Sequence, residues 1–358
     1  MTPRRRGTMP NGAARHSDDD DNDTSSSDRQ PLLRSVGPLA TNRGWRSSWA
    51  IAAVLLALTL AASLTLRSPS SSSSSSSGTN PANHLPATNA GRIIAIGDLH
   101  GDYANALHVF RLAGLTDANG DWTGKQTTLV QTGDVVDRGP DTIRLYRWLE
   151  RLERQAEEAG GRVIALLGNH EVMNLLQDLR YVTPEDTASF GGAAARIQAW
   201  SATGWLGSRL RTLPIVAHVS NTVFLHGGLH PRWAVRGIDG LNNDTRNAFA
   251  TMSDDALRRL PLFHGDGPLW YRGYAQDDER VACPLLESAL KAVNATRMVL
   301  GHTPQLDTGK VLSRCGGRVY IIDVGISAVY GGNHAALEII GNRVVGLHDD
   351  GPEVLVEG

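Results

Sequence analysis

From residue 91 onward, apolar positions along the chain follow two alternating spacings. The short apolar runs RIIAI, TTLVQT and RVIALL have the length of buried strands, whereas DYANALHVFRLAGL and PDTIRLYRWLERLERQAEEAG repeat their apolar positions at helical spacing. Strands that alternate with helices in this way predict βαβ units with parallel strands. We therefore expect an α/β domain over residues 91–358.

The second half of this domain contains more strand-like runs and shorter connections. These runs are PIVAHV, TVFLHG, RMVLGH, RVYIIDV, HAALEII and RVVGLHD. They predict a second sheet that packs on the first. Residues 192–205 are predicted to form one further helix.

The first ninety residues have a different pattern. Residues 1–48 contain PRRR and SDDDDNDTSSSD with almost no apolar periodicity, which is typical of a disordered tail. Residues 49–66, WAIAAVLLALTLAASLTL, carry no charge. As a helix they would measure about 27 Å, close to the hydrocarbon thickness of a bilayer. A serine-rich stalk, residues 67–90, follows.

Residues 49–66 could instead form a buried helix of a soluble domain or a cleaved signal peptide. The polar flanks argue against a buried helix, and the distance from the amino terminus, with an acidic run upstream, argues against a signal peptide. We therefore expect a transmembrane signal anchor.

Basic residues predict the orientation of this anchor. Four arginines lie on its amino-terminal side and only two lie at a comparable distance beyond it: Arg29, Arg34, Arg43 and Arg46 against Arg67 and Arg92. The tail is thus expected in the cytosol and the α/β domain in a lumen or outside the cell. The acceptor triplets at Asn243 and Asn294 are compatible with glycosylation there.

The tail also contains DRQPLL, from Asp28 to Leu33, which resembles the acidic dileucine signal that cytosolic sorting adaptors bind. A sorting adaptor is therefore one expected partner, and an endosomal or vacuolar membrane is the corresponding location.

Charge and cysteine content limit the chemistry of the domain. The net charge of -2 gives no bias toward nucleic acid as a partner. Only Cys283 and Cys315 are present, so neither a disulfide framework nor a thiolate zinc site is available. The two cysteines form either one disulfide or two free thiols. Any metal must be bound by oxygen and imidazole.

Five apolar runs end in polar side chains, namely IAIGDLHGD, LVQTGDVVDRG, IALLGNHE, VFLHGG and MVLGHT. In layered α/β folds, the carboxyl ends of strands form the crevice where ligands bind. We therefore expect these side chains to converge. Glycine before each polar group allows a sharp exit from the strand and close approach to a ligand. The candidate ligand residues are Asp98, His100, Asp134, Asn169, His226 and His302.

Carboxylate, amide oxygen and imidazole together suit manganese, iron or zinc. Six donors exceed what one ion with open positions needs, and they suffice for two ions if one carboxylate bridges. Two ions about 3.5 to 4 Å apart can lower the pKa of a shared water and hold the oxygens of an in-line phosphoryl displacement. The sequence therefore predicts a dinuclear hydrolase of phosphate esters.

The ordered motifs GDLHGD, GDVVDRG, GNHE, HGG and GHT resemble the calcineurin-like metallophosphoesterases, in particular the phosphoprotein phosphatase branch. Within that branch, GNHEVMNLLQDLRYV, PLWYRG and DVGISAVYGG are similar to the bacterial-type Shewanella-like phosphatases. The main eukaryotic serine/threonine enzymes carry arginine at the position of Leu167. The resemblance covers residues 92–332 and implies a two-sheet β-sandwich flanked by helices.

The resemblance also implies a role for each motif residue. Asp98, His100 and Asp134 would hold the first metal, with Asp134 as the bridge, and Asn169, His226 and His302 would complete the second. A hydroxide that bridges the metals would attack the phosphorus directly. His170, oriented by Asp137, would protonate the leaving group, and Arg138 and Arg272 would bind the phosphate.

Other polar residues have no motif support and are expected to be structural. Asp102 is predicted to cap the following helix. Asn169 and His170 are expected in an irregular loop that lets them point to different sides. The remaining histidines are His108, His218, His230, His264, His334 and His348.

Three functions from different classes are compatible with this sequence. The first is a protein phosphatase acting on phosphoserine, phosphothreonine or phosphotyrosine, and the second is a hydrolase of small phosphate or pyrophosphate compounds such as dinucleoside polyphosphates. The third is a non-catalytic, membrane-anchored binding protein. The complete set of acid, ligand and arginine positions disfavours the third.

Overall fold

The computed structural model describes residues 91–358. The predicted tail (residues 1–48), anchor (49–66), stalk (67–90) and sorting signal lie outside the described residues and stay predictions. No helix between residues 91 and 358 is long and apolar enough to cross a bilayer.

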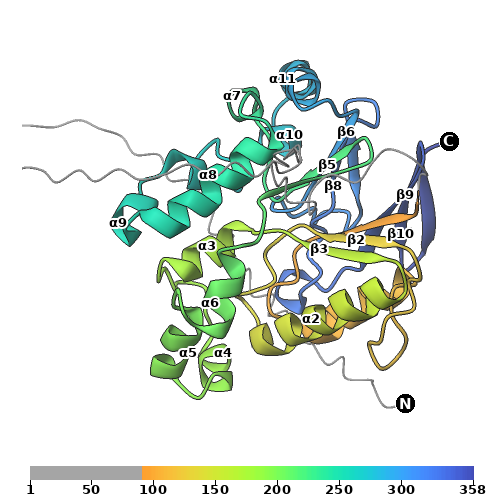
Figure 1. Cartoon of the computed structure of the whole chain (residues 1–358). Helices are drawn as coiled ribbons and strands as arrows, with labels where there is room; N and C mark the ends of the chain where they lie inside the picture. Colours follow the sequence, from red (N-terminus) through yellow and green to blue (C-terminus); the bar gives the residue numbers. More distant parts are fainter. Residues whose placement is uncertain (1–90) are drawn as a thin grey trace, which may run out of the picture. The chain divides into compact units, whose positions relative to one another are not determined.

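The first strands of the domain form the parallel part of a six-stranded sheet with the order β11-β10-β9-β1-β2-β3. Strands β1 (Ile93–Ile96), β2 (Thr128–Gln131) and β3 (Arg162–Ala165) are parallel to one another. Helices α1 (Tyr103–Leu112) and α2 (Thr142–Glu158) connect them (Figure 1). The predicted βαβ units are confirmed.

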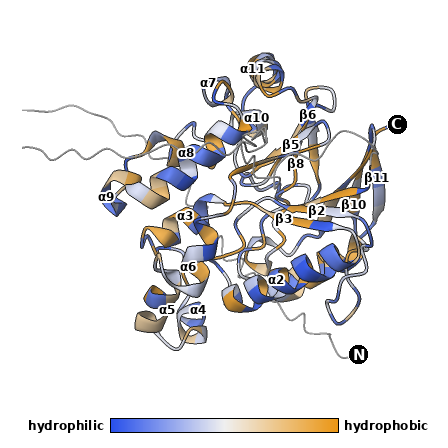
Figure 2. Cartoon of the chain, viewed as in Figure 1, coloured by the Kyte–Doolittle hydropathy of each residue, from blue (hydrophilic) through white to orange (hydrophobic). Residues whose placement is uncertain are grey.

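The two connecting helices are amphipathic, as their apolar spacing predicts. Leu145, Leu149 and Leu152 of α2 are buried, because residues three and four positions apart share one face of a helix. Hydrophilic residues cover much of the rest of α2 (Figure 2). The side chain of Asp102 accepts a hydrogen bond from the backbone N–H of Asn105, so the predicted helix cap is confirmed.

The second sheet has five strands in the order β4-β5-β6-β8-β7. Strands β5, β6 and β8 are parallel, while β4 and β7 pair antiparallel at the two edges. The bounds are β4 (Val216–Val219), β5 (Thr222–Leu225), β6 (Arg297–Leu300), β7 (Leu312–Arg314) and β8 (Val319–Ile321). Apolar side chains of both sheets form one continuous core.

The last three strands do not join the second sheet, so the expectation that all later strands would do so is wrong. β9 (Ala335–Ile340) pairs antiparallel with β1, and β10 (Arg343–His348) and β11 (Gly351–Val356) continue the first sheet. β9 thereby covers the edge of β1 that faces away from β2, which would otherwise expose unpaired backbone groups.

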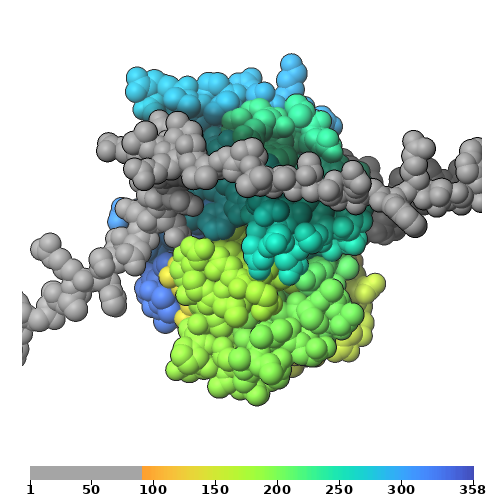
Figure 3. Space-filling model, turned by 90° about the vertical axis from the view of Figure 1, so that its left-hand side faces the viewer, coloured from red at the N-terminus to blue at the C-terminus, as the bar shows by residue number. Residues whose placement is uncertain are grey.

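The remaining helices follow β3 or lie between β5 and β6 in the chain (Figure 1). Figure 3 shows the face of the domain that residues of both segments share, in green and teal. Those after β3 are α3 (Asn169–Leu175), α4 (Pro184–Ser189), α5 (Ala193–Trp200) and α6 (Trp205–Leu210). Those between β5 and β6 are α7 (Pro231–Ala234), α8 (Ile238–Thr251), α9 (Asp254–Leu257), η1 (Pro261–Phe263), α10 (Gly273–Gln276) and α11 (Glu279–Ala292).

The predicted single helix over residues 192–205 is wrong, because the chain turns between α5 and α6. Ser201 has extended backbone, and the N–H of Gly204 donates to the carbonyl of Ser201. A Cβ atom on Gly204 would lie only 2.1 Å from the carbonyl oxygen of Gln198, so this close turn requires glycine.

The two cysteines form a disulfide. Cys283 on α11 is bonded to Cys315, which lies between β7 and β8, and the bond closes a separation of 32 residues. Of the two states that the sequence left open, the structure has the disulfide.

Candidate active site

The predicted site residues converge at the carboxyl ends of the strands. Asp98 follows β1, Asp134 follows β2, and His226 and His302 follow β5 and β6 of the other sheet. Asp134 lies at the centre, because its Oδ2 atom is 3.3 Å from Nε2 of His226, 3.8 Å from Nε2 of His170 and 3.9 Å from Nε2 of His100. The predicted convergence of these side chains at the strand ends is confirmed.

Glycines in the motifs allow this close approach. A Cβ atom on Gly168 would lie 2.1 Å from Oδ1 of Asp134, and one on Gly301 would lie 2.4 Å from Oδ1 of Asp98. Both distances are far below van der Waals contact, so only glycine fits beside each carboxylate.

The backbone of the site is also strained. Five site residues other than glycine have positive φ angles, which larger side chains rarely adopt: His100, Asp134, Asp137, Arg138 and His302. Such strain persists only where the surrounding structure enforces it, and it is concentrated at functional sites.

Three histidines are each held by a backbone carbonyl through one ring nitrogen. The pairs are His100 Nδ1 with Val136 O (3.0 Å), His226 Nδ1 with Thr132 O (3.0 Å) and His302 Nε2 with Trp270 O (3.2 Å). Because a carbonyl only accepts hydrogen bonds, the nitrogen next to it carries the proton, and the second nitrogen of a neutral ring is left with a free lone pair. The contacts thus prepare three ring nitrogens to bind a metal.

His226 and Asn169 provide a direct test of whether a cation fits. Nε2 of His226, the nitrogen without the proton, lies 2.7 Å from Oδ1 of Asn169. Two acceptors at this distance repel each other unless a cation lies beside both. The pair therefore fits a metal site.

Two buried carboxylates give a second indication. Asp98 and Asp134 are 1% and 2% exposed, and neither forms an ion pair with a lysine or arginine in the part of the chain that the structure describes. Burial, together with the charges of Asp323 and Asp134, raises the pKa of Asp98 well above its usual value. Cations would relieve this repulsion.

The potential ligand atoms divide into two groups, and Asp134 belongs to both. One group is His100, Asp134 and His170, the other is Asp134, His226 and His302, and within each group the atoms lie within 4.8 Å of one another. A carboxylate shared between two groups fits a dinuclear centre with a bridging ligand. His170, which the sequence predicts as the acid, belongs to the first group. The predicted ligand Asp98 belongs to neither of these two groups.

The pKa values distinguish His170 from the other histidines. Burial and the charge of His170 lower the pKa of His100 to about 4, and burial and Arg272 lower that of His302 well below its usual value. Burial alone would lower the pKa of His170 too, but Asp134 and the hydrogen-bonded Asp137 raise it overall. The lowered pKa values of His100 and His302 favour the neutral ring that a metal ligand needs, whereas the raised pKa of His170 favours its protonated form.

The imidazole of His170 belongs to an ordered hydrogen-bond network. Nδ1 of His170 is 2.7 Å from Oδ2 of Asp137, and the side-chain amide of Asn174 donates to both carboxylate oxygens of Asp137 at 2.9 Å. Asp137 is thereby fixed in a position that orients the imidazole.

Asn169 and His170 occupy the first turn of α3, so the expectation of an irregular loop is wrong. Consecutive residues of a helix nevertheless point in directions about 100° apart. Asn169 can therefore face His226 while His170 contacts Asp137.

The two predicted phosphate-binding arginines lie at the same end of the domain. The guanidinium of Arg138 stacks 4.0 Å from the ring centre of Tyr181 and lies 5.4 Å from that of Tyr330. Its Nε atom is buried and has no hydrogen-bond partner among residues 91–358, which fits a donor that awaits an anion. Arg272 donates to the carbonyl of His302 at 2.6 Å and thereby supports the loop of that histidine.

Sequence reasoning did not identify two carboxylates of the site. Glu171 is fully buried and accepts hydrogen bonds from the backbone N–H groups of Asp134, Val135 and Gly168, so it holds two motif loops together. Its position three residues after Gly168, at the start of a helix, is the spacing of a capping residue and could have revealed it.

Asp323 is the second omitted carboxylate. It follows β8 in the run RVYIIDV, so the rule that identified the other strand ends would have included it. Burial raises its pKa to about 6. It lies close enough to Asp98 to raise the pKa of that carboxyl.

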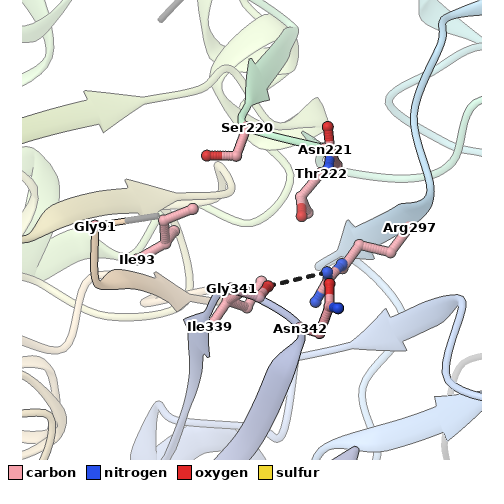
Figure 4. Close-up of a pocket in the computed structure, with 9 residues that line it drawn as sticks. All are labelled: Gly91, Ile93, Ser220, Asn221, Thr222, Arg297, Ile339, Gly341 and Asn342. Carbon is pink, nitrogen blue, oxygen red and sulfur yellow. Dashed lines mark hydrogen bonds between the residues drawn. The ribbon is translucent and has the colours of Figure 1, made fainter. Parts of the chain in front are cut away.

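A separate cavity of about 230 Å³ lies at the other end of the strands. Figure 4 shows Arg297, at the start of β6, with its side chain bonded to the carbonyl of Gly341 beside this cavity. Its lining includes Ile93 and Thr222, which begin β1 and β5. Because the predicted site residues follow the opposite ends of these strands, the cavity is not part of their site.

Comparison with known proteins agrees with this geometry. Residues 91–306 match the family model of the calcineurin-like phosphoesterases. An uncharacterised protein of Schizosaccharomyces pombe is 42% identical over 70% of this chain and 77% of its own length. Shewanella-like protein phosphatase 2 of Arabidopsis thaliana is 32% identical over 66% of this chain and 71% of its own.

Solved structures and a more distant relative give two further likenesses. A cold-active protein tyrosine phosphatase superposes with a TM-score of 0.67 at 30% identity, covering 77% of this chain and 82% of that one. A symmetrical bis(5'-nucleosyl)-tetraphosphatase of Janthinobacterium is 28% identical over 46% of this chain and 55% of its own length. The two mixed sheets flanked by helices fit the metallophosphatase fold.

Proposed function

Because this chain belongs to the calcineurin-like phosphoesterase family and is a metal-dependent phosphatase, we propose that its substrates are phosphorylated side chains of proteins. The observation that supports cleavage of a phosphomonoester is the buried His170–Asp137–Asn174 network beside the shared carboxylate of Asp134. In this proposal the imidazole, whose pKa Asp134 and Asp137 raise against the effect of burial, lies next to the ligand groups, where an alkoxide or phenoxide leaving group needs a proton.

In this proposal, Asp98, His100 and Asp134 hold one metal ion, and Asn169, His226 and His302 complete the site of a second, with Asp134 shared between them. Manganese, iron and zinc all suit these donors. When bound, the ions lower the pKa of water and neutralise charge on the phosphate oxygens.

The other residues act on the substrate. The unpaired Nε of Arg138 and its stacked guanidinium offer a planar donor group to the phosphate oxygens, and Arg272 adds positive charge from the His302 side of the site. Asp137 and Asn174 hold the imidazole so that His170 can donate its proton from Nε2 to the leaving oxygen.

Protein substrates are favoured by the relatives with broader coverage. The relative named as a protein phosphatase matches 66% of this chain, whereas the one named as a dinucleoside tetraphosphatase matches 46%. Because of the similarity to the dinucleoside tetraphosphatase, hydrolysis of dinucleoside polyphosphates is the alternative function.

The proposal is tested with the full chain supplied with manganese. We would compare kcat/KM for a phosphotyrosine peptide, a phosphoserine peptide and diadenosine tetraphosphate, with Asp134→Asn as the inactive control. We expect at least one of the peptides to be hydrolysed with higher kcat/KM than the dinucleotide. A preference for the dinucleotide would establish the alternative.

We also propose that the phosphatase domain lies in a lumen or outside the cell, anchored by residues 49–66. The Cys283–Cys315 disulfide supports an oxidising compartment. In intact vesicles, added protease should remove the tail and leave the domain whole. Digestion of the domain with protection of the tail would show the opposite orientation. If the sorting signal is used, the double variant Leu32→Ala and Leu33→Ala should move the protein to the cell surface.

A further inference from the structure

Two histidines and an aspartate that are far apart in sequence meet on the surface, outside the proposed active site. Nε2 of His108 lies 2.8 Å from Oδ1 of Asp349, and Nδ1 of His334 lies 2.6 Å from Oδ2 of the same carboxylate. The two imidazole rings stack with their centres 4.0 Å apart. The three residues come from α1, from the segment after the short 3-10 helix η2 (Ala328–Tyr330), and from the turn between β10 and β11.

Asn105 determines which nitrogen of His334 carries a proton. The amide nitrogen of Asn105 donates to Oδ2 of Asp102 at 2.8 Å, so the amide oxygen faces the ring of His334, 2.9 Å from its Nε2. An amide oxygen only accepts, and Nε2 of His334 must therefore donate. The neutral ring then directs the lone pair of Nδ1 at a carboxylate oxygen.

A lone pair and a carboxylate oxygen 2.6 Å apart repel each other unless a positive charge lies between them. A proton on Nδ1 or a metal ion can supply that charge. Histidines that bind metals commonly donate a hydrogen bond from their second ring nitrogen, which sets the tautomer and the ring orientation. Nε2 of His334 makes such a hydrogen bond to Asn105.

We propose that His108, His334 and Asp349 form a binding site for a divalent transition-metal ion such as zinc, separate from the phosphatase centre. Two imidazoles and one carboxylate are a donor set that zinc accepts, with water in the remaining position. Each residue offers a ligand atom, and these atoms lie within 4.8 Å of one another.

To accept the ion, the carboxylate and one ring must reorient, because the histidines contact different oxygens of Asp349 and their stacked ring planes lie 21° apart. Tetrahedral zinc with bonds of about 2.0 to 2.1 Å holds its ligand atoms about 3.4 Å apart. The present separations of 2.8 and 2.6 Å would therefore widen by less than about 1 Å. The side chains of His108 and Asp349 are 49% and 53% exposed, so they are free to move outward.

Bound metal would also fasten a segment that contacts the active site, a consequence that rests on the proposed function. Asp102 accepts hydrogen bonds from Asn105 and from the backbone N–H of Ala328, the first residue of η2. Tyr330, the last residue of η2, packs 5.1 Å from the ring centre of His100. An ion on His334 would thus stiffen the segment that carries Tyr330.

The test uses the full chain with its phosphatase centre first saturated with manganese. Zinc is titrated by calorimetry, and zinc and manganese are both counted by elemental analysis after excess metal is removed. Because zinc binds nitrogen and oxygen ligands more tightly than manganese, the manganese released is subtracted, and we expect the wild-type chain to take up one zinc ion more than the manganese that it loses. His108→Ala should lose this uptake, and Asn105→Ala should weaken it about 10- to 100-fold, as loss of an orienting partner does.

His264→Ala is the matched control, because it removes an exposed histidine away from the cluster, and it should bind zinc like the wild type. His108 is exposed on α1, so alanine there should not prevent folding. Equal zinc uptake by wild type and His108→Ala, or zinc uptake only in exchange for manganese, would overturn the proposal. None of these readings depends on phosphatase activity, so the proposed function can fail independently.

Discussion

The two sides of the candidate active site shift the pKa of a buried histidine in opposite directions. His170 and His302 are both buried, and both lie near Asp134. His170 contacts the carboxylate of Asp137, and its pKa is raised although burial opposes this. His302 contacts the backbone carbonyl of Trp270 and lies near Arg272, and burial together with that arginine lowers its pKa.

Because burial lowers the pKa of both histidines, the difference between them comes from their neighbouring groups. A carboxylate at the second nitrogen keeps an imidazole charged, so it can donate a proton. A carbonyl partner and a nearby arginine favour the neutral ring, whose free nitrogen can bind a metal. We call these the acid side (His170, Asp137 and Asn174) and the ligand side (Asn169, His226 and His302).

Asp134 lies between the acid side and the ligand side, and its removal should have the largest effect. Asp134→Asn removes the carboxylate that both groups of ligand atoms share. We expect no measurable hydrolysis of a phosphopeptide and the loss of one or both manganese ions by elemental analysis. Asp239→Asn, an exposed aspartate on α8, is the control and should retain both properties. Full metal content with wild-type activity in Asp134→Asn would refute the dinuclear assignment.

Changing the acid side alone should separate chemistry from metal binding. His170→Asn should keep the metal content and reduce kcat for a phosphotyrosine or phosphoserine peptide by about 10² to 10⁴, the usual contribution of a general acid. The loss should be much smaller for an aryl phosphate whose leaving group needs no proton.

The control for this variant is His264→Asn, which changes an exposed histidine and should leave both rates intact. Loss of metal in His170→Asn, or equal losses on good and poor leaving groups, would place His170 on the ligand side. That outcome would agree with its position in one group with His100 and Asp134.

Asp137→Asn should show the same selectivity with a smaller loss, about 10- to 100-fold on the peptide, because Asp137 only orients the ring. Its charge and hydrogen bond help to raise the pKa of His170. Without them that pKa falls, so the protonated acid is lost at a lower pH. The alkaline limb of kcat/KM should therefore move to lower pH than in the wild type. An unchanged or upward-shifted limb would contradict the proposed link between the two residues.

Much of the fold could be predicted from local pattern. The strands β1, β2 and β3 and the helices between them follow directly from apolar spacing, since each strand is a short apolar run and each helix repeats its apolar positions at helical spacing. The return of β9, β10 and β11 to the first sheet could not be predicted in this way, because strand order depends on which sheet edge needs a partner. Nor does periodicity reveal a tight turn such as that at Gly204 within a helical pattern.

Only part of the site could be predicted from local pattern. Residues with chemistry at strand ends, such as Asp98 and His226, were visible because each interrupts an apolar run. Asn174 was not visible, because it acts through a folded contact with Asp137. The spacing of Glu171 predicts a helix cap, but not its contact with the backbone of Asp134. His108 and His334 came together only through tertiary structure, and no motif in the sequence links them.

Asn174 provides the smallest and most selective test of the comparison. Its amide donates to both oxygens of Asp137, and its oxygen accepts from Arg196 at 2.7 Å. Asn174→Ala leaves the acid and the metal ligands in place but frees Asp137 to rotate. We expect an approximately two- to tenfold loss of kcat on the peptide, the range that a net hydrogen bond of about 0.5 to 1.5 kcal/mol allows.

Because Arg196 also loses a partner, lower stability must be distinguished from poorer positioning of the acid. The measured quantity is the ratio of peptide to aryl phosphate turnover, at a temperature well below the unfolding midpoint. Poor positioning lowers this ratio, since only the peptide needs the proton, whereas partial unfolding lowers both rates equally. Asn247→Ala, an exposed asparagine on α8, should leave the ratio unchanged. An unchanged ratio in Asn174→Ala would show that Asp137 holds His170 without help from its neighbour.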